Sequence, residues 1–274
     1  MDYVSYQPGA NVSLQDMKLL MLEMLDEIDR FCMEHKITYY LIGGTLLGAI
    51  RHNGFIPWDD DIDIGMPRMD YERFISIFES KSGNTLIIDH RNTAHYVWPF
   101  AKAIHNKTTL TEEGCERCPI GVYIDIFPID RVNGQFADAC NKVDRVRFRK
   151  DVFELKYLKI DKKRSMAKNA IIILSRVLRV VPDRYLINNI VRACTVDKSS
   201  TNFKYVCNYV GAWGKKEIMP AEYFDDVIRH EFEGRDYCIP LKYDQYLKTV
   251  YGDYMIPPAP EKRISHHNHV VCWK

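Results

Sequence analysis

The segment 61–66 constrains the fold more than any other part of the chain, because it begins by alternating charged and apolar residues. Residues two apart on a strand point to the same face, so Asp61 and Asp63 share one face while Ile62 and Ile64 enter the core. Two neighbouring carboxylates repel each other, and a half-buried strand tolerates them only with a cation between them. Carboxylate oxygens are the ligands that Mg²⁺ and Mn²⁺ prefer. The segment therefore predicts a strand that carries a divalent-metal site.

A third carboxylate occurs in a second apolar segment. Asp125 lies between Ile124 and Ile126, where an isolated charge would be costly unless a metal site lay beside it. Two carboxylates on one strand and a third on a nearby strand are what a two-metal phosphoryl-transfer centre requires. Asp59 and Asp60, which directly precede the alternating pair, are better explained as a solvated acidic turn.

A glycine pair stands just before this acidic segment. Gly43 and Gly44 separate an expected strand from an expected helix, and Thr45 follows them. Such a pair lets the backbone approach a ligand closely and turns amide groups outward at a helix start, which suits a phosphate. The motif is weak by itself, because most such pairs are ordinary turns.

Hydrophobic periodicity predicts a mixed α/β arrangement through residue 129. A methionine-rich apolar stripe recurs at three- and four-residue steps over 13–36 and predicts a long helix packed on the core. A second helix over 70–80 is expected to bury Phe74, Ile77 and Phe78. The other expected elements are helices over 45–50 and 243–251, strands over 39–42, 86–89, 98–104 and 122–127, and a hairpin of strands over 227–232 and 236–239.

The composition changes in the segment 142–192, whose local charge is +10 while the rest of the chain carries −9. We expect a catalytic core over 1–130, a basic helical segment over 131–220, and a hairpin, helix and tail over 221–274 that pack back on the core as one compact unit. The basic segment has three interpretations: a solvated helix face, contact with an anionic membrane through the apolar residues of 171–178, or nucleic-acid binding. Nothing else in the chain supports nucleic acid.

The overall composition is that of a soluble globular protein. The 274 residues are 46% hydrophobic and 27% charged, with a net charge of +1, which argues against long disorder and against a nucleic-acid coat protein. We find no signal-peptide pattern at the N-terminus and no apolar stretch long enough to span a bilayer. The 8 cysteines are scattered, and we interpret them as reduced thiols in a cytoplasmic protein.

Two motifs are hard to produce by chance: Gly-Gly-Thr-Leu-Leu-Gly at 43–48 and Pro-Trp-Asp-Asp-Asp-Ile-Asp at 57–63. With them, the chain strongly resembles the LicD family, the phosphocholine transferases of bacterial surface glycans, to whose wider group the fukutin-related transferases belong. The resemblance covers most of the chain, is thinnest between 133 and 219, and continues in order through the segments 67–74, 100–102, 123–128, 251–254 and 257–263.

The resemblance implies a nucleotidyltransferase-type fold, a small mixed sheet flanked by helices and extended here by the basic helical segment. It implies that Gly43, Gly44 and Thr45 meet phosphate, and that Asp61, Asp63 and Asp125 hold Mg²⁺ or Mn²⁺. The donor would be CDP-choline or another CDP-alcohol. The phospho-alcohol would pass to a sugar hydroxyl of a cell-surface glycan, such as lipopolysaccharide or teichoic acid, or of its lipid-linked precursor, and CMP would leave. By position alone, Asp125 is also our candidate base for the acceptor hydroxyl.

Other residues have weaker support as ligands. Lys102 either pairs with the donor diphosphate or is an exposed edge lysine, and Arg51 and His52 either contact phosphate or lie on the surface. Three aromatic residues either enclose a quaternary ammonium or pack in the core, and a basic tail either closes over the nucleotide or is a solvated end. These residues are Trp58, Tyr96 and Trp98 for the aromatic group, and Arg263, His266 and His267 for the tail.

Two rival functions stay open at this point. One is a nucleotidyltransferase that uses a free NTP and releases pyrophosphate, and the other is a catalytically inactive protein that binds nucleotide or glycan. Cys115 and Cys118 have the spacing of zinc ligands, but no second such pair completes a site of four. A location at the inner face of the membrane would suit a lipid-linked acceptor.

Overall fold

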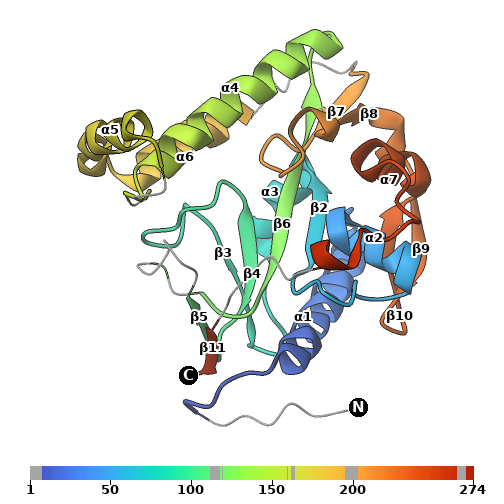
Figure 1. Cartoon of the computed structure of the whole chain (residues 1–274). Helices are drawn as coiled ribbons and strands as arrows, with labels where there is room; N and C mark the ends of the chain where they lie inside the picture. The colour runs from blue at the N-terminus through green and yellow to red at the C-terminus, as the bar shows by residue number, and fades with distance from the viewer. Residues whose placement is uncertain are drawn as a thin grey trace.

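The computed structural model describes residues 8–111, 118, 120–158, 160–161, 164–194, 203–263 and 270–274. Figure 1 shows the arrangement, with a twisted sheet at the centre and helices around it. The helices are α1 (Leu14–His35), α2 (Gly43–His52), α3 (Arg68–Ile77), α4 (Phe136–Leu155), α5 (Met166–Leu174), η1 (Ser175–Val180), α6 (Asp183–Cys194), η2 (Gly214–Glu217), η3 (Ala221–Phe224), α7 (Tyr243–Tyr251) and η4 (Pro260–Lys262). The strands are β1 (Tyr40–Leu41), β2 (Asp63–Pro67), β3 (Thr85–Ile88), β4 (Ala101–His105), β5 (Thr108–Thr111), β6 (Tyr123–Val132), β7 (Tyr205–Cys207), β8 (Ile218–Pro220), β9 (Val227–Phe232), β10 (Arg235–Pro240) and β11 (Val270–Trp273).

The N-terminal helix α1 forms where its apolar stripe predicts it. The Ser13 hydroxyl accepts a hydrogen bond from the backbone N–H of Asp16 at 3.1 Å and caps the first turn. Lys36 ends the helix in the left-handed conformation. Met17, Met21 and other apolar residues of the stripe are buried in the main core, so the core-packing interpretation is confirmed.

The main sheet has the strand order β1-β2-β6-β4-β3, and β7 and β8 continue it from β6. Strands β2 and β6 are parallel, whereas the other pairs in this sheet are antiparallel. The register places Asp63 beside Asp125 and Asp125 beside Lys102 on three consecutive strands. The expected mixed α/β (α+β) fold class is confirmed, and the register brings two of the three predicted metal ligands together.

The long strand β6 connects two hydrophobic cores. Its first part pairs with β2 and β4 over the main core, and its last residues pair with β7 (Figure 1). A second core forms between α4, α6 and the segment around β7, with Val146, Ile187 and Cys207 fully buried. The division of the chain at residues 130 and 220 stays a prediction.

Several element bounds differ from those expected. Helix α3 ends at Ile77, so that Ile77 is exposed and Phe78 is only partly buried, while Phe74 is fully buried as expected. Helix α2 begins at Gly43 rather than Thr45, since a glycine with a φ of 56° can make the sharp turn from β1. Strand β2 begins at Asp63, and Asp61 lies before it in a segment without regular secondary structure.

The C-terminal elements return to the earlier part of the molecule. The hairpin β9–β10 and helix α7 occur where the pattern predicts them, and α7 packs against α2. Strand β11 pairs with β5. Within the described residues, no helix is both long and apolar enough to cross a bilayer.

Candidate active site

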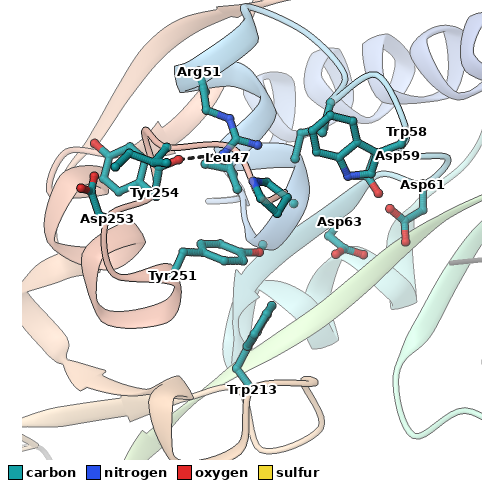
Figure 2. A pocket seen from close by; sticks show the side chains of 15 residues that line it. Leu47, Arg51, Trp58, Asp59, Asp61, Asp63, Trp213, Tyr251, Asp253 and Tyr254 are labelled. Carbon is teal, nitrogen blue, oxygen red and sulfur yellow. Dashed lines mark hydrogen bonds between the residues drawn. The ribbon is translucent and has the colours of Figure 1, made fainter. Parts of the chain in front are cut away.

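A pocket of about 420 Å³ lies between the start of α2, the acidic turn before β2, and the segments around η2 and after α7. Figure 2 shows Asp59, Asp61 and Asp63 on one side of the pocket, with Trp58 beside them, and Tyr251, Asp253 and Tyr254 on the opposite side. The pocket is lined by Gly43, Gly44, Leu47, Arg51, Ile56, Trp58, Asp59, Asp61, Asp63, Trp213, Tyr251, Asp253, Tyr254, Ile256 and Pro258.

Asp63 is fixed at the first position of β2, where its backbone N–H donates to the Thr45 hydroxyl at 2.8 Å. Burial raises the pKa of the Asp63 carboxyl well above its ordinary value, and the charges of Asp61, Asp125 and Asp59 raise it further. Burial is the largest cause, and the second is negative charge gathered in one place, which a divalent cation would relieve. Thr45 thus serves the site by orienting Asp63.

The acidic turn itself forms a tighter cluster than the sequence predicted. Asp59, Asp60 and Asp61 each offer a carboxylate oxygen, and these oxygens lie within 4.8 Å of one another. Asp60 is buried, so its interpretation as part of a solvated turn is wrong, whereas Asp59 is partly exposed and lines the pocket. A set of carboxylate oxygens next to Asp63, whose pKa is raised, fits the oxygen ligands that Mg²⁺ and Mn²⁺ prefer. Asp59 and Asp60 are therefore candidate metal ligands in addition to Asp61 and Asp63, although the sequence did not indicate them.

Asp125 and Lys102 form a buried ion pair behind this wall. The Lys102 ammonium donates to Asp125 Oδ1 at 2.5 Å, and its side chain is 2% exposed. The interpretation of Lys102 as an exposed edge lysine is therefore wrong, because β4 lies between β6 and β3 inside the sheet. The ammonium also lies 3.5 Å from the ring centroid of Tyr123 and 4.7 Å from that of Trp98. Neither Lys102 nor Asp125 lines the pocket.

The glycine pair contributes space rather than only amide donors. A Cβ atom on Gly44 would lie 2.7 Å from Asp59 Oδ2, and one on Gly43 would lie 3.0 Å from Asp63 Oδ2. The Gly43 N–H donates to the Tyr246 hydroxyl at 3.1 Å, so that amide is already engaged within the protein. The pair allows helix α2 to start directly against the carboxylates.

The predicted basic residues take different positions. Arg51 lines the pocket, and its Nη1 donates to the Tyr254 carbonyl at 2.7 Å. Burial and the Arg51 charge lower the pKa of His52, which favours a neutral ring and makes it a poor partner for phosphate. The Arg263 guanidinium lies 5.5 Å from the ring centroid of Trp58, a residue that lines the pocket.

The three predicted aromatic residues are not brought together in the pocket. Trp58 lines it, but Tyr96 is buried and donates its hydroxyl to the Phe100 carbonyl, and Trp98 packs beside Tyr96. A cage of Trp58, Tyr96 and Trp98 is therefore wrong, because the last two pack away from the pocket on the Lys102 side of the sheet.

Other aromatic residues form the wall opposite the carboxylates. The rings of Trp213 and Tyr251 meet at 4.9 Å between centroids, and the Tyr251 hydroxyl is directed toward the aspartates (Figure 2). Tyr251, Asp253 and Tyr254 belong to the segment 251–254 already noted in the family resemblance, which could have marked them. Nothing in the sequence around Trp213 distinguishes it.

Three predicted residues lie outside the described part of the chain: His266, His267 and Cys115. Cys118 is a buried free thiol.

Comparison of the chain with known proteins identifies its family. Residues 36–168 match the family model described as LicD/FKTN/FKRP, nucleotidyltransferase domain. The chain is also 33% identical over 271 residues to the lipopolysaccharide cholinephosphotransferase LicD of Haemophilus influenzae, covering 93% of this chain and 96% of that protein. The chain belongs to the LicD family.

Shorter matches extend the relation of this LicD-family protein. It is 37% identical over 62 residues to the ribitol 5-phosphate transferase FKRP of Mus musculus, which is 23% of this chain and 12% of that protein. It is 39% identical over 59 residues to an uncharacterized protein of Rickettsia typhi, which is 22% of this chain and 19% of that protein. The resemblance to the LicD family and to the fukutin-related proteins is confirmed, while the roles of individual site residues stay predictions.

Proposed function

We propose that this LicD-type phosphotransferase moves a phospho-alcohol from a CDP-alcohol to a sugar hydroxyl of a cell-surface glycan or its lipid-linked precursor, releasing CMP. Phosphocholine is our first choice of transferred group, because the LicD relative that matches nearly the whole chain is named a cholinephosphotransferase. The single observation that supports the chemistry most is the convergence of Asp59, Asp61 and Asp63 beside the double-glycine helix start in one pocket.

We assign the metal ligands to the acidic wall. Asp61 and Asp63 remain the primary candidates, with Asp59 and Asp60 able to contribute further oxygens. When bound, Mg²⁺ or Mn²⁺ would neutralise charge on the transferring phosphoryl group and on the leaving CMP. The chain's own part is to gather the carboxylates and to keep space beside them, which the side-chain-free Gly43 and Gly44 do.

Residues around the carboxylates complete the assignment. Arg51 supplies a fixed positive charge on the pocket wall, held in place by its hydrogen bond to the Tyr254 carbonyl. Asp125 lies beside Asp63 in the sheet but does not line the pocket, and Lys102 holds its carboxylate in one orientation, so we assign it to the support of Asp63 and not to the acceptor hydroxyl. Lys102 acts through Asp125 in this proposal, rather than on the donor diphosphate.

The aromatic wall suits the head group of the donor. Trp213, Tyr251 and Trp58 line the same pocket as the carboxylates, and aromatic faces attract a quaternary ammonium. Asp253 adds a carboxylate to that end of the pocket. This set takes over the role that the sequence assigned to Tyr96 and Trp98.

The proposal is tested by incubating the full chain with CDP-choline, CDP-glycerol or CDP-ribitol and Mg²⁺ or Mn²⁺, and measuring CMP. We expect CMP from CDP-choline, and its loss in the Asp61→Asn/Asp63→Asn variant. Asp225→Asn, which changes an exposed aspartate outside the pocket, is the matched control. Pyrophosphate release from free CTP, without CMP from any donor, would instead establish a nucleotidyltransferase. Donor binding without turnover in the presence of acceptor glycan would establish an inactive binding protein.

A further inference from the structure

Exposed apolar side chains are concentrated in one part of the molecule. Helix α5 buries only Ile172, although it is the most apolar helix segment of the basic region. Leu174, Val177 and Val180 are 74%, 69% and 81% exposed. In Figure 1, α5 lies at the outer end of the α4–α6 pair, away from the sheet. Other large apolar residues exposed in the same region are Phe148, Leu158, Ile160, Met166, Ile171, Ile173 and Tyr185.

The charge around this apolar face is positive. Lys168, Arg176, Arg179 and Arg184 are exposed on α5, η1 and α6. The acidic residue among them, Asp183, is paired with the Lys156 ammonium. An apolar helix face bordered by basic residues is the pattern of a helix that lies in the interface of an anionic bilayer.

We propose that α5 and η1, residues 166–180, form a docking surface for an anionic membrane. The apolar side chains enter the boundary between headgroups and acyl chains, and the basic side chains meet anionic headgroups. A second copy of the chain is a poorer occupant, because a symmetric contact would bring the same basic residues of both copies together. The surface is independent of the proposed function, since it shares no residue with the carboxylate pocket.

A groove lies between the sheet and the segment that directly precedes this surface in the sequence. Its volume is about 620 Å³, and it runs from Leu158, Ile160 and Arg164 to Trp98 and Phe100. These two aromatic residues lie against the Lys102 ammonium. The groove contains charged as well as apolar side chains and shares none of residues 166–180, so it is a neighbour of the docking surface and not a part of it.

Vesicle sedimentation tests the proposal with the full chain. Vesicles of phosphatidylcholine alone are compared with vesicles that also contain about a third phosphatidylglycerol. We expect binding to the anionic vesicles only, weakened by salt. The apolar variant Leu174→Asp/Val177→Asp and the charge variant Lys168→Glu/Arg176→Glu should each reduce the partition coefficient about tenfold or more.

Matched substitutions elsewhere on the surface provide the controls. Met69→Asp replaces an exposed methionine on α3, and Arg73→Glu/Lys107→Glu reverses two exposed charges away from α5. These variants should sediment like the unchanged protein. Binding by either the apolar or the charge variant as strong as that of the unchanged protein, or no binding of the unchanged protein to anionic vesicles, would overturn the proposal. So would a shift from dimer to monomer in the apolar variant with vesicle binding unchanged. CMP release from a soluble donor should be unaffected by every one of these substitutions, which separates this test from that of the proposed function.

Discussion

Lys102 is a charged side chain in the interior of a sheet, and its surroundings explain how it is tolerated there. Its ammonium pairs with Asp125, and the rings of Tyr123, Trp98 and Phe100 surround it. A buried charge is stable only when it is compensated, so each partner of this pair depends on the other. The pair also restricts the orientation of the carboxylate next to Asp63.

Removing one charge of the pair should destabilise the protein strongly. Lys102→Met leaves the Asp125 carboxylate buried without its partner and should lower the free energy of unfolding by about 3–5 kcal/mol, measured by urea denaturation. The double variant Lys102→Met/Asp125→Asn should recover part of that loss, because no isolated charge remains. Lys107→Met, on an exposed turn, is the control. A single variant as stable as the original protein would show that the pair is not needed.

Asp63 is expected to be required for function but to lower the free energy of unfolding of the metal-free protein. Its carboxylate lies among the charges of Asp61, Asp125 and Asp59, which repel it. Asp63→Asn should therefore raise the free energy of unfolding of the metal-free protein by about 1–2 kcal/mol. The same variant should lose CMP release and weaken Mn²⁺ binding in calorimetry. If stability falls and Mn²⁺ affinity is unchanged, the assignment of Asp63 to the metal is wrong.

At the scale of elements, the start of α2 determines the shape of the site. The helix begins at Gly43, and its first residues lie against the side chains of Asp59 and Asp63. The hydroxyl of Thr45, in the first turn of α2, accepts a hydrogen bond from the backbone N–H of Asp63. A second hydrogen bond, from the Ile42 N–H to the Asp63 carbonyl at 3.1 Å, also joins the helix start to the strand start, and the absence of side chains on Gly43 and Gly44 allows them to lie close together.

A methyl group at Gly44 should disturb the metal site without unfolding the helix. Gly44 does not have a positive φ, and alanine favours helices, so Gly44→Ala should change the free energy of unfolding by less than about 1 kcal/mol. Its Cβ would meet Asp59 Oδ2 at 2.7 Å and displace that carboxylate. Mn²⁺ affinity and CMP release should each fall about tenfold or more.

Gly83→Ala gives the contrasting control. Its Cβ would meet no atom within 4 Å, but its φ is 70°. This variant should lose stability through backbone strain and keep its Mn²⁺ affinity. An unchanged Mn²⁺ affinity in Gly44→Ala would mean that Asp59 does not contribute to the metal site.

At the scale of the whole molecule, the pocket depends on the junction between the two cores. Trp213 reaches the aromatic wall from the segment before η2, and Glu217 at the end of η2 is buried beneath it. The backbone N–H of Trp213 donates to Glu217 Oε1 at 3.4 Å. Burial raises the pKa of Glu217 from 4.5 to about 7.

This raised pKa predicts a pH dependence of stability. The folded state binds the Glu217 proton more tightly than the unfolded chain, so its contribution is most favourable at acidic pH and is lost as pH rises toward 7. Between pH 5.5 and 8, the free energy of unfolding should fall by an amount on the order of 2 kcal/mol more in the original protein than in Glu217→Gln. Urea denaturation at both pH values measures this difference, and other titrating groups cancel in it. Parallel profiles of the two proteins would contradict it.

Much of the site could be predicted from local patterns. The period of two in the segment 61–66 predicted a strand that carries Asp63, although the strand begins two residues later than expected, and the apolar neighbours of Asp125 indicated a buried carboxylate. The glycine pair indicated the helix start. These features depend only on backbone geometry and on residues close in sequence, so the sequence alone indicated Asp61 and Asp63 and placed a helix just after the glycine pair. It did not indicate Asp59 and Asp60 as part of the site.

The partners of these residues depended on the tertiary structure. Lys102 faces Asp125 because of the register between β4 and β6, and Trp213 faces the aspartates because distant segments pack around the end of β6. Tyr96 turns away from the pocket into the core for the same kind of reason. Helical periodicity marks an apolar face on α5, but only the packing of the whole chain leaves that face exposed. Strand register and long-range packing arise from contacts between residues far apart in the chain, which no local pattern encodes.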